Sequence, residues 1–190
     1  VTKTYASAGA RTVTLTVIDS GAPPAASTPV SVKVFPGNSP PSGEIVLQNL
    51  TDPARSALYR AGDQWSFAAA NLSDDQTPTG AISVTWTITF QHREHNHPFI
   101  SGLAGSGGTM TIPTSGEYEP FVWYRLTMSL TDAQGQTVQV VRDLRPERAL
   151  VTIASDPGGA AFEVDSNPIV ATTVVSRVVG FQMRVAPVEQ

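Results

Sequence analysis

The sequence of 190 residues contains no cysteine, only two lysines and no long apolar run. Without cysteine the chain has no disulfide bond, zinc–thiolate site, iron–sulfur cluster or thiol nucleophile. A formal net charge of −4 does not provide the basic surface that nucleic-acid binding requires, so we expect no nucleic-acid partner. No apolar stretch is long enough to cross a bilayer as a helix, and we expect no membrane span.

The residues that are abundant indicate β-structure. Fifteen glycines and fifteen prolines are spread along the chain, as is typical of turns between many short strands. Valine, threonine and serine dominate the segments between them, and no long window has apolar residues at helical spacing. We therefore predict an all-β chain of tandem immunoglobulin-like antiparallel sandwich units with a small β unit at its C-terminal end.

The clearest strand lies in the middle of the sequence. Apolar residues alternate with threonines from Val84 to Phe90, which predicts a strand with one buried face and places Trp86 in the core. The alternation ends at His92. The polar residues that follow, as far as Pro98, predict an exposed loop.

The positions of strands and prolines divide the chain into four segments. Residues 1–36 are interpreted as the closing strands of an incomplete sandwich unit and 37–43 as a proline-rich linker. Residues 44–145 are predicted to form a sandwich of about seven or eight strands, and 146–190 a small β unit of about four. An isolated pair of strands cannot bury its own apolar face. We therefore expect the N-terminal strands to pair with another segment or another copy of the chain.

An internal repeat links the first unit to the sandwich. Residues 15–19 with Gly21 show the same order of strand, acidic turn and glycine as residues 128–132 with Gly135. This self-similarity predicts two tandem modules of one sandwich class.

The N-terminal segment has a recognisable spacing of aromatic, glycine, apolar and acidic residues. It is formed by Tyr5, Gly9, Val13, Leu15, Val17, Asp19 and Gly21. The spacing resembles the closing strands of a PKD domain, an immunoglobulin-like module of surface and secreted proteins. Arg11 stands where the pattern usually has an aromatic residue.

Further motifs lie in the middle of the chain, at residues 59–63, 85–90, 92–99, 116–117, 122–125 and 131–132. Together they look like a histidine-rich β-sandwich module of exported bacterial proteins, found beside PKD domains and behind propellers similar to glucose/sorbosone dehydrogenases. The resemblance implies an extracellular or cell-surface location, with the other domains of the same parent protein as partners. The parent would be an oxidoreductase. The resemblance implies no catalysis by this chain, because the propeller that would hold the cofactor is not among these residues.

All three histidines of the chain lie in this module. In an extended segment His95 and His97 point the same way, and a turn at residues 93–94 would bring His92 to them. Grouped imidazoles suit copper or zinc, and Glu94 offers an oxygen ligand or an acceptor behind an imidazole. The sequence thus predicts a copper or zinc site; the alternative is a group of solvated histidines at the end of a strand.

The remaining candidate sites are weaker. Trp123 is out of phase with the buried rows, and we interpret it as an exposed aromatic contact for a ligand such as polysaccharide. Asp74 and Asp75 match no calcium loop and predict a solvated turn. The glycine-rich residues 102–108 lack the context of a phosphate loop and predict a flexible loop. Serine and aspartate are scattered without a catalytic pattern, so we expect no enzyme activity.

Two functions are consistent with these features. The first is a non-catalytic adhesion or spacer module of a secreted or cell-surface bacterial protein, in contact with carbohydrate or another cell-surface partner. The alternative is a copper- or zinc-binding accessory module of a fused sugar-dehydrogenase-like oxidoreductase. Metal binding by the histidines distinguishes them.

Overall fold

The structure is a computed structural model, and it describes residues 2–116, 121–156 and 158–188. The chain is 54% strand and 2% helix, so the all-β prediction is confirmed. Glu117, which belongs to the motif at residues 116–117, lies outside the described residues. In the described part of the chain, no helix has the length and apolar character needed to cross a membrane.

The elements follow one another in this order: β1 (Arg11–Leu15), β2 (Val30–Val34), β3 (Ser42–Asn49), β4 (Leu58–Tyr59), β5 (Gln64–Ser73), η1 (Thr79–Ala81), β6 (Ser83–His92), β7 (His95–Ala104), β8 (Gly107–Thr111), β9 (Val122–Thr131), β10 (Thr137–Pro146), β11 (Arg148–Ile153), β12 (Phe162–Val164), β13 (Asn167–Ile169), β14 (Thr173–Val178) and β15 (Val185–Pro187).

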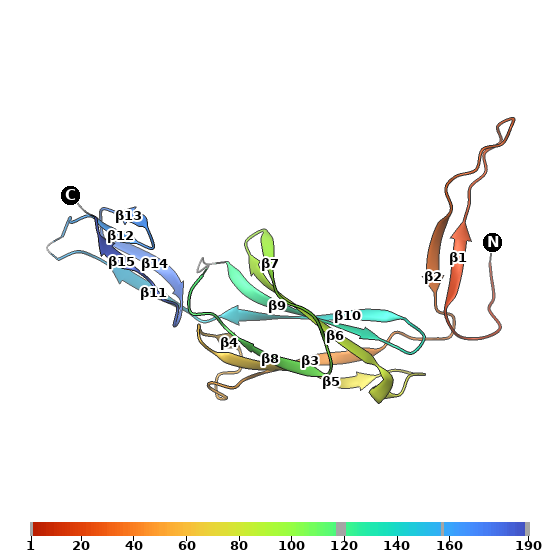
Figure 1. Cartoon of the computed structure of the whole chain (residues 1–190), viewed down its shortest axis with the longest axis horizontal. Helices are drawn as coiled ribbons and strands as arrows, with labels where there is room; N and C mark the ends of the chain where they lie inside the picture. The colour runs from red at the N-terminus through yellow and green to blue at the C-terminus, as the bar shows by residue number, and fades with distance from the viewer. Residues whose placement is uncertain (1, 117–120, 157, 189–190) are drawn as a thin grey trace.

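The largest part of the molecule is a sandwich of two sheets. One sheet has five strands in the order β4-β10-β9-β6-β7, and the other has three in the order β3-β5-β8. Their pairings are antiparallel except for the short parallel pair of β4 with β10. Figure 1 shows the β1–β2 hairpin at one end of the molecule and strands β11 to β15 at the other.

The main core lies between these two sheets. The alternation in β6 points Trp86 inward with 0% exposure, and β9 contributes Leu126 and Met128, also at 0%. Phe67 of β5 meets Trp86 edge to face, with ring centroids 4.9 Å apart. The indole Nε1 of Trp86 donates to the carbonyl of Gly105 at 2.9 Å. Trp86 is therefore the core residue that the period of two predicted.

The glycine-rich connection between β7 and β8 is not the flexible loop that its composition predicts. β7 extends to Ala104 and β8 begins at Gly107, so only two residues separate them. A Cβ atom on Gly107 would lie 2.2 Å from the carbonyl oxygen of Phe67, and one on Gly108 would lie 2.9 Å from the Phe67 ring. The prediction was wrong because these glycines allow β8 to approach β5 closely, which a strand can require as much as a loop can.

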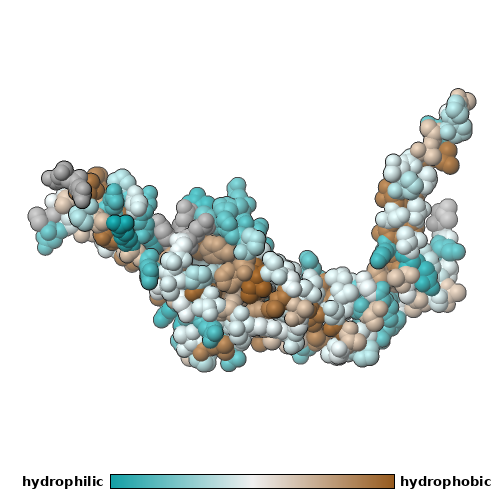
Figure 2. Space-filling model, in the orientation of Figure 1, coloured by the Kyte–Doolittle hydropathy of each residue, from teal (hydrophilic) through white to brown (hydrophobic). Residues whose placement is uncertain are grey.

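The β1–β2 hairpin leaves its apolar side chains exposed. Pairing of Val13 with Val32 and of Leu15 with Val30 puts four apolar side chains on one face. These residues are between 40% and 70% exposed, and Figure 2 shows apolar surface along this hairpin. Among the described residues, no other element packs against this face.

An aspartate caps backbone amides in the connection of this hairpin and in that of the β9–β10 hairpin of the sandwich. Asp19 Oδ1 accepts hydrogen bonds from the backbone amides two and six residues further on, at 3.0 and 2.8 Å. Asp132 Oδ1 accepts them from the amides two and four residues further on, at 2.9 and 2.7 Å. The repeat seen in the sequence therefore corresponds to the same use of a carboxylate at two hairpins.

The C-terminal unit contains five short strands where about four were predicted. β11 pairs with β14, and β12 lies between β13 and β15. Ile153 and Phe162 belong to its own small core, whereas Val178 and Phe181 pack into the core of the sandwich. The unit is thus attached to the sandwich by apolar contacts as well as by the chain.

Candidate metal centre

The three histidines lie on one β-hairpin and not in a loop beyond the strand. β6 continues through His92 and β7 begins at His95, and these two residues pair directly. The turn consists of residues 93–94, with Arg93 at a φ of +50°, as tight hairpin turns commonly require. The prediction of an exposed loop was wrong because pairing with β7 on one side and β9 on the other extends β6 to the hairpin tip.

The histidines continue the inward-facing rows of their strands. His92 follows Phe90 at the spacing of two that places Trp86 inside, and Phe90 pairs with His97 on β7. His92 is half-buried, whereas His95 and His97 are exposed. The signal was present in the sequence, because positions 90 and 92 and positions 95 and 97 keep the strand period. That period alone does not reveal the continuation, because polar residues usually mark the end of a buried face.

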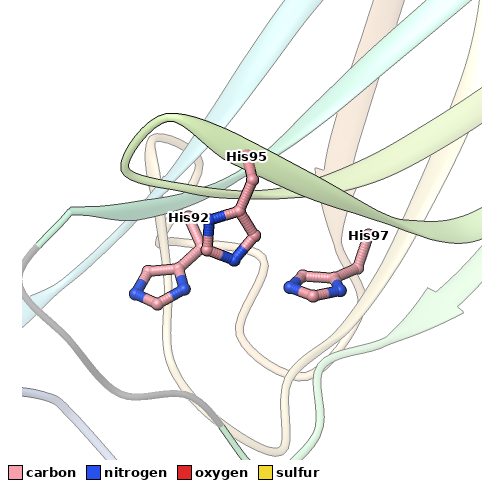
Figure 3. A group of neighbouring side chains, drawn as sticks. All are labelled: His92, His95 and His97. Carbon is pink, nitrogen blue, oxygen red and sulfur yellow. The ribbon is translucent and has the colours of Figure 1, made fainter.

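The imidazole rings gather on one side of this hairpin, as Figure 3 shows. The ring centroids of His92 and His95 are 4.8 Å apart, and those of His95 and His97 are 5.0 Å apart. One ligand nitrogen from each ring lies within 4.8 Å of the others. In a tetrahedral zinc site with Zn–N bonds near 2.0–2.1 Å, the ligating nitrogens are about 3.3 Å apart. Small side-chain rotations on a fixed backbone would therefore complete a three-histidine site.

Glu94 does not join this group. It lies in the exposed turn, and the ligand atoms that converge in the described part of the chain come from His92, His95 and His97. A ligand set of nitrogen atoms suits copper or zinc and does not suit calcium or magnesium, which prefer oxygen. Three protein ligands also leave a coordination position for water or another molecule.

Trp123 lies on the outer face of the five-stranded sheet and is half-buried. Two guanidinium groups lie over its ring, with Cζ of Arg145 at 5.3 Å and Cζ of Arg125 at 5.9 Å from the centroid. Arg125 is in turn held by Asp143, with its Nε 2.8 Å from Oδ1. The ring face therefore has cationic partners from within the chain, and a sugar would have to displace them.

Asp74 and Asp75 form a turn, in agreement with the sequence. Asp74 Oδ1 accepts the backbone amides of Gln76 at 3.0 Å and of Thr77 at 2.6 Å. Hydrogen bonds from these amides hold the pKa of Asp74 below its usual value. The Asp74 carboxylate is therefore explained by local backbone contacts, and Asp75 Oδ1 accepts the backbone amide of Ser39 at 3.4 Å.

Asp63, in the motif at residues 59–63, is a buried carboxylate with structural partners. It accepts hydrogen bonds from Arg55 Nη1 at 2.5 Å, from the amide of Arg60 at 2.7 Å and from Asn49 Nδ2 at 3.1 Å. Burial alone would raise the pKa of Asp63, but the hydrogen bonds from Arg55 and the Arg60 amide outweigh it and hold that pKa below its usual value. Asp63 therefore fixes the turn before β5 as a charged group.

Comparison with known proteins adds no relative to this geometry. The chain matches no protein-family model, no curated protein and no solved structure.

Proposed function

We propose that this chain is a non-catalytic β-sandwich module that binds a copper or zinc ion at the tip of the β6–β7 hairpin. The observation that supports the proposal is the convergence of the imidazoles of His92, His95 and His97, with ligand nitrogens within 4.8 Å of one another. The resemblance of the sequence to exported bacterial modules adds a secreted or cell-surface location to the proposal. The other domains of a larger parent protein, an oxidoreductase, are its proposed partners.

The hairpin favours metal binding for two reasons. Its backbone is held by pairing on both sides of β6, so binding requires side-chain adjustment and little ordering of the chain. The rings of His95 and His97 are also exposed, so an ion can reach them from solvent. If the three histidines were only solvated surface residues, their imidazoles would not need to converge.

Metal binding is tested by equilibrium dialysis and calorimetric titration with Zn²⁺ and Cu²⁺, followed by elemental analysis. We expect about one ion per chain for the wild type and at least about tenfold weaker binding for the variant with His92→Ala, His95→Ala and His97→Ala combined. Glu94→Ala is the matched control, because Glu94 lies in the same hairpin but outside the cluster, and it should bind like the wild type. Equal metal content in the wild type and the triple variant would contradict the proposal.

A spacer or adhesion role is the second candidate and is favoured by the shape of the molecule. Figure 1 shows the N-terminal hairpin, the sandwich and the C-terminal unit following one another along the longest axis. A contact of Trp123 with carbohydrate is less favoured, because Arg125 and Arg145 already lie over its ring. Glycan-array binding that is lost in Trp123→Ala, but retained in the triple histidine variant, would favour this role over metal binding.

A further inference from the structure

A cavity of about 250 Å³ lies beside the histidine hairpin, where the sandwich meets the C-terminal unit. Its wall includes Phe90 and Phe99 from the hairpin strands, Tyr59 and Tyr124 from the same sheet, and Phe181 from the C-terminal unit. The cavity is partly open to solvent. A partly open cavity with five aromatic residues in its wall has the form that small-molecule binding sites commonly take.

The aromatic wall is organised around Tyr124. The ring centroids of Tyr59, Phe90 and Phe99 lie 5.3, 5.2 and 4.9 Å from that of Tyr124, at interplanar angles of 70°, 53° and 65°. Such inclined arrangements are the ones that aromatic pairs prefer. Tyr59 and Tyr124 are 2% and 3% exposed, so these rings are held in place and the wall is preformed.

No aspartate, glutamate, lysine or arginine of the described ranges lines the cavity. Burial raises the pKa of the Tyr59 phenol and of the Tyr124 phenol, so both remain protonated. A charged ligand would lose its hydration on entering and find no opposite charge in the wall. The exposed lining residues, His97 and Ser115 among them, place polar side chains at the mouth.

We propose that this cavity binds a neutral compound with a single aromatic ring, whose polar substituent points to the mouth at His97. The size supports this class, because an apolar cavity of about 150 Å³ already accommodates benzene, and the larger volume leaves room for a short substituent. The proposal requires the cavity and does not require the metal. It therefore goes beyond the proposed function and can fail separately from it.

The test uses para-fluorophenol with the whole chain in the presence of EDTA, observed by fluorine NMR. We expect saturable broadening with the wild type, and at least about tenfold weaker binding of para-fluorobenzoate, which has the same ring with a negative charge. Absence of saturable binding, or equal binding of the two compounds, would overturn the proposal. Binding that appears only when Zn²⁺ replaces EDTA would also overturn it, because the compound would then be a metal ligand.

Two variants locate the binding. Ser115→Trp places a large ring at the mouth and should weaken binding of para-fluorophenol by at least about tenfold. Phe121→Ala removes an exposed ring that is not part of the wall and should bind like the wild type. Phe99→Ala removes one ring of the wall and serves as the second test if circular dichroism shows that Ser115→Trp does not fold. Wild-type affinity in a folded Ser115→Trp or Phe99→Ala variant would place the compound elsewhere.

Discussion

The inner face of β6 is buried near the start of the strand and partly exposed near its end. Near its start, Trp86 lies against Phe67 of the three-stranded sheet and is completely buried. Near its end, Phe90 and His92 belong to the same row, but Phe90 lines the cavity and His92 joins an exposed cluster. One strand with one period therefore supplies both the core and the candidate sites.

The difference follows from what faces the strand. The first half is opposed by β5, which belongs to a sheet of only three strands. The second half faces connecting residues such as Pro113 and Ser115 and the C-terminal Phe181, which line the cavity without filling it. An inward-facing position thus becomes core where a second sheet covers it and becomes available for binding where the cover ends.

The largest expected effect comes from the covered half. Trp86→Ala should lower the free energy of unfolding by about 3–5 kcal/mol, since it removes a large buried ring and the hydrogen bond to Gly105. Phe99→Ala, on β7 beside the uncovered half of β6, should lower it by only about 1–2 kcal/mol, because that ring is half-buried. Urea denaturation of both variants measures the two values. Equal losses would show that the two halves are packed alike.

The next effect concerns the cover itself. Asp63 anchors the start of β5 through Arg55 and the Arg60 amide. Asp63→Asn removes the charge that Arg55 needs and should cost about 2 kcal/mol. Asp75→Asn, at an exposed position, is the matched control and should change stability by less than about 0.5 kcal/mol. Thermal melts should rank the two variants in the same order as urea denaturation; a larger loss for Asp75→Asn than for Asp63→Asn would contradict this account.

Acid should lower the free energy of unfolding by a smaller amount. Arg125 lowers the pKa of Asp143 by a hydrogen bond, and Arg55 with the Arg60 amide lowers that of Asp63 against the effect of burial. A carboxyl whose pKa is lower in the folded state stabilises it above the unfolded value, near 3.9, and this stability is lost as the pH falls through the folded value. We expect stability to be constant from about pH 7 to 5 and to fall by about 1–2 kcal/mol by about pH 2–3. Urea midpoints across this range measure the fall, which should be smaller in Asp63→Asn; an unchanged midpoint down to pH 2 would be the contrary result.

The smallest effect on folding is expected in the uncovered half. The triple alanine variant at His92, His95 and His97 should unfold within about 0.5 kcal/mol of the metal-free wild type, because the core is complete without these rings. With Zn²⁺ at about 100 times its dissociation constant, the wild type should gain about 2.7 kcal/mol and the variant nothing. Melts with zinc and with chelator measure both values. Unfolding of the wild type by chelator alone would mean that the hairpin is part of the folding core.

The sequence predicted the features that depend on the residue pattern of a single strand or turn. The period of two in β6 was sufficient to place Trp86 in the core, and the turn at residues 93–94 followed from the spacing of the histidines. The close approach of Gly107 to Phe67 depends on a contact between strands far apart in the chain, and composition alone suggested a loop. The extension of β6 through His92 likewise depends on pairing with β7 and β9.

The candidate sites were predictable to a different extent. The three histidines were identifiable because they are the only ones in the chain and are closely spaced. The absence of Glu94 from the histidine cluster was not predictable, because it depends on where the side chains of a two-residue turn point. The cavity was not predictable, because its wall combines β4, β6, β7, β9 and the C-terminal Phe181. No local sequence pattern indicates that these elements contact one another.

The junction between the sandwich and the C-terminal unit has a mechanical consequence. Glu147 is the single residue between β10 and β11, its amide donates to Tyr59 O at 2.7 Å and its carbonyl accepts from Val179 at 2.9 Å. Its carboxylate is clamped by Arg60, with both contacts at 2.8 Å. Contacts through both the backbone and the side chain of Glu147 restrict rotation of the C-terminal unit about this residue. The two parts are therefore expected to reorient less freely than domains joined by a peptide linker alone.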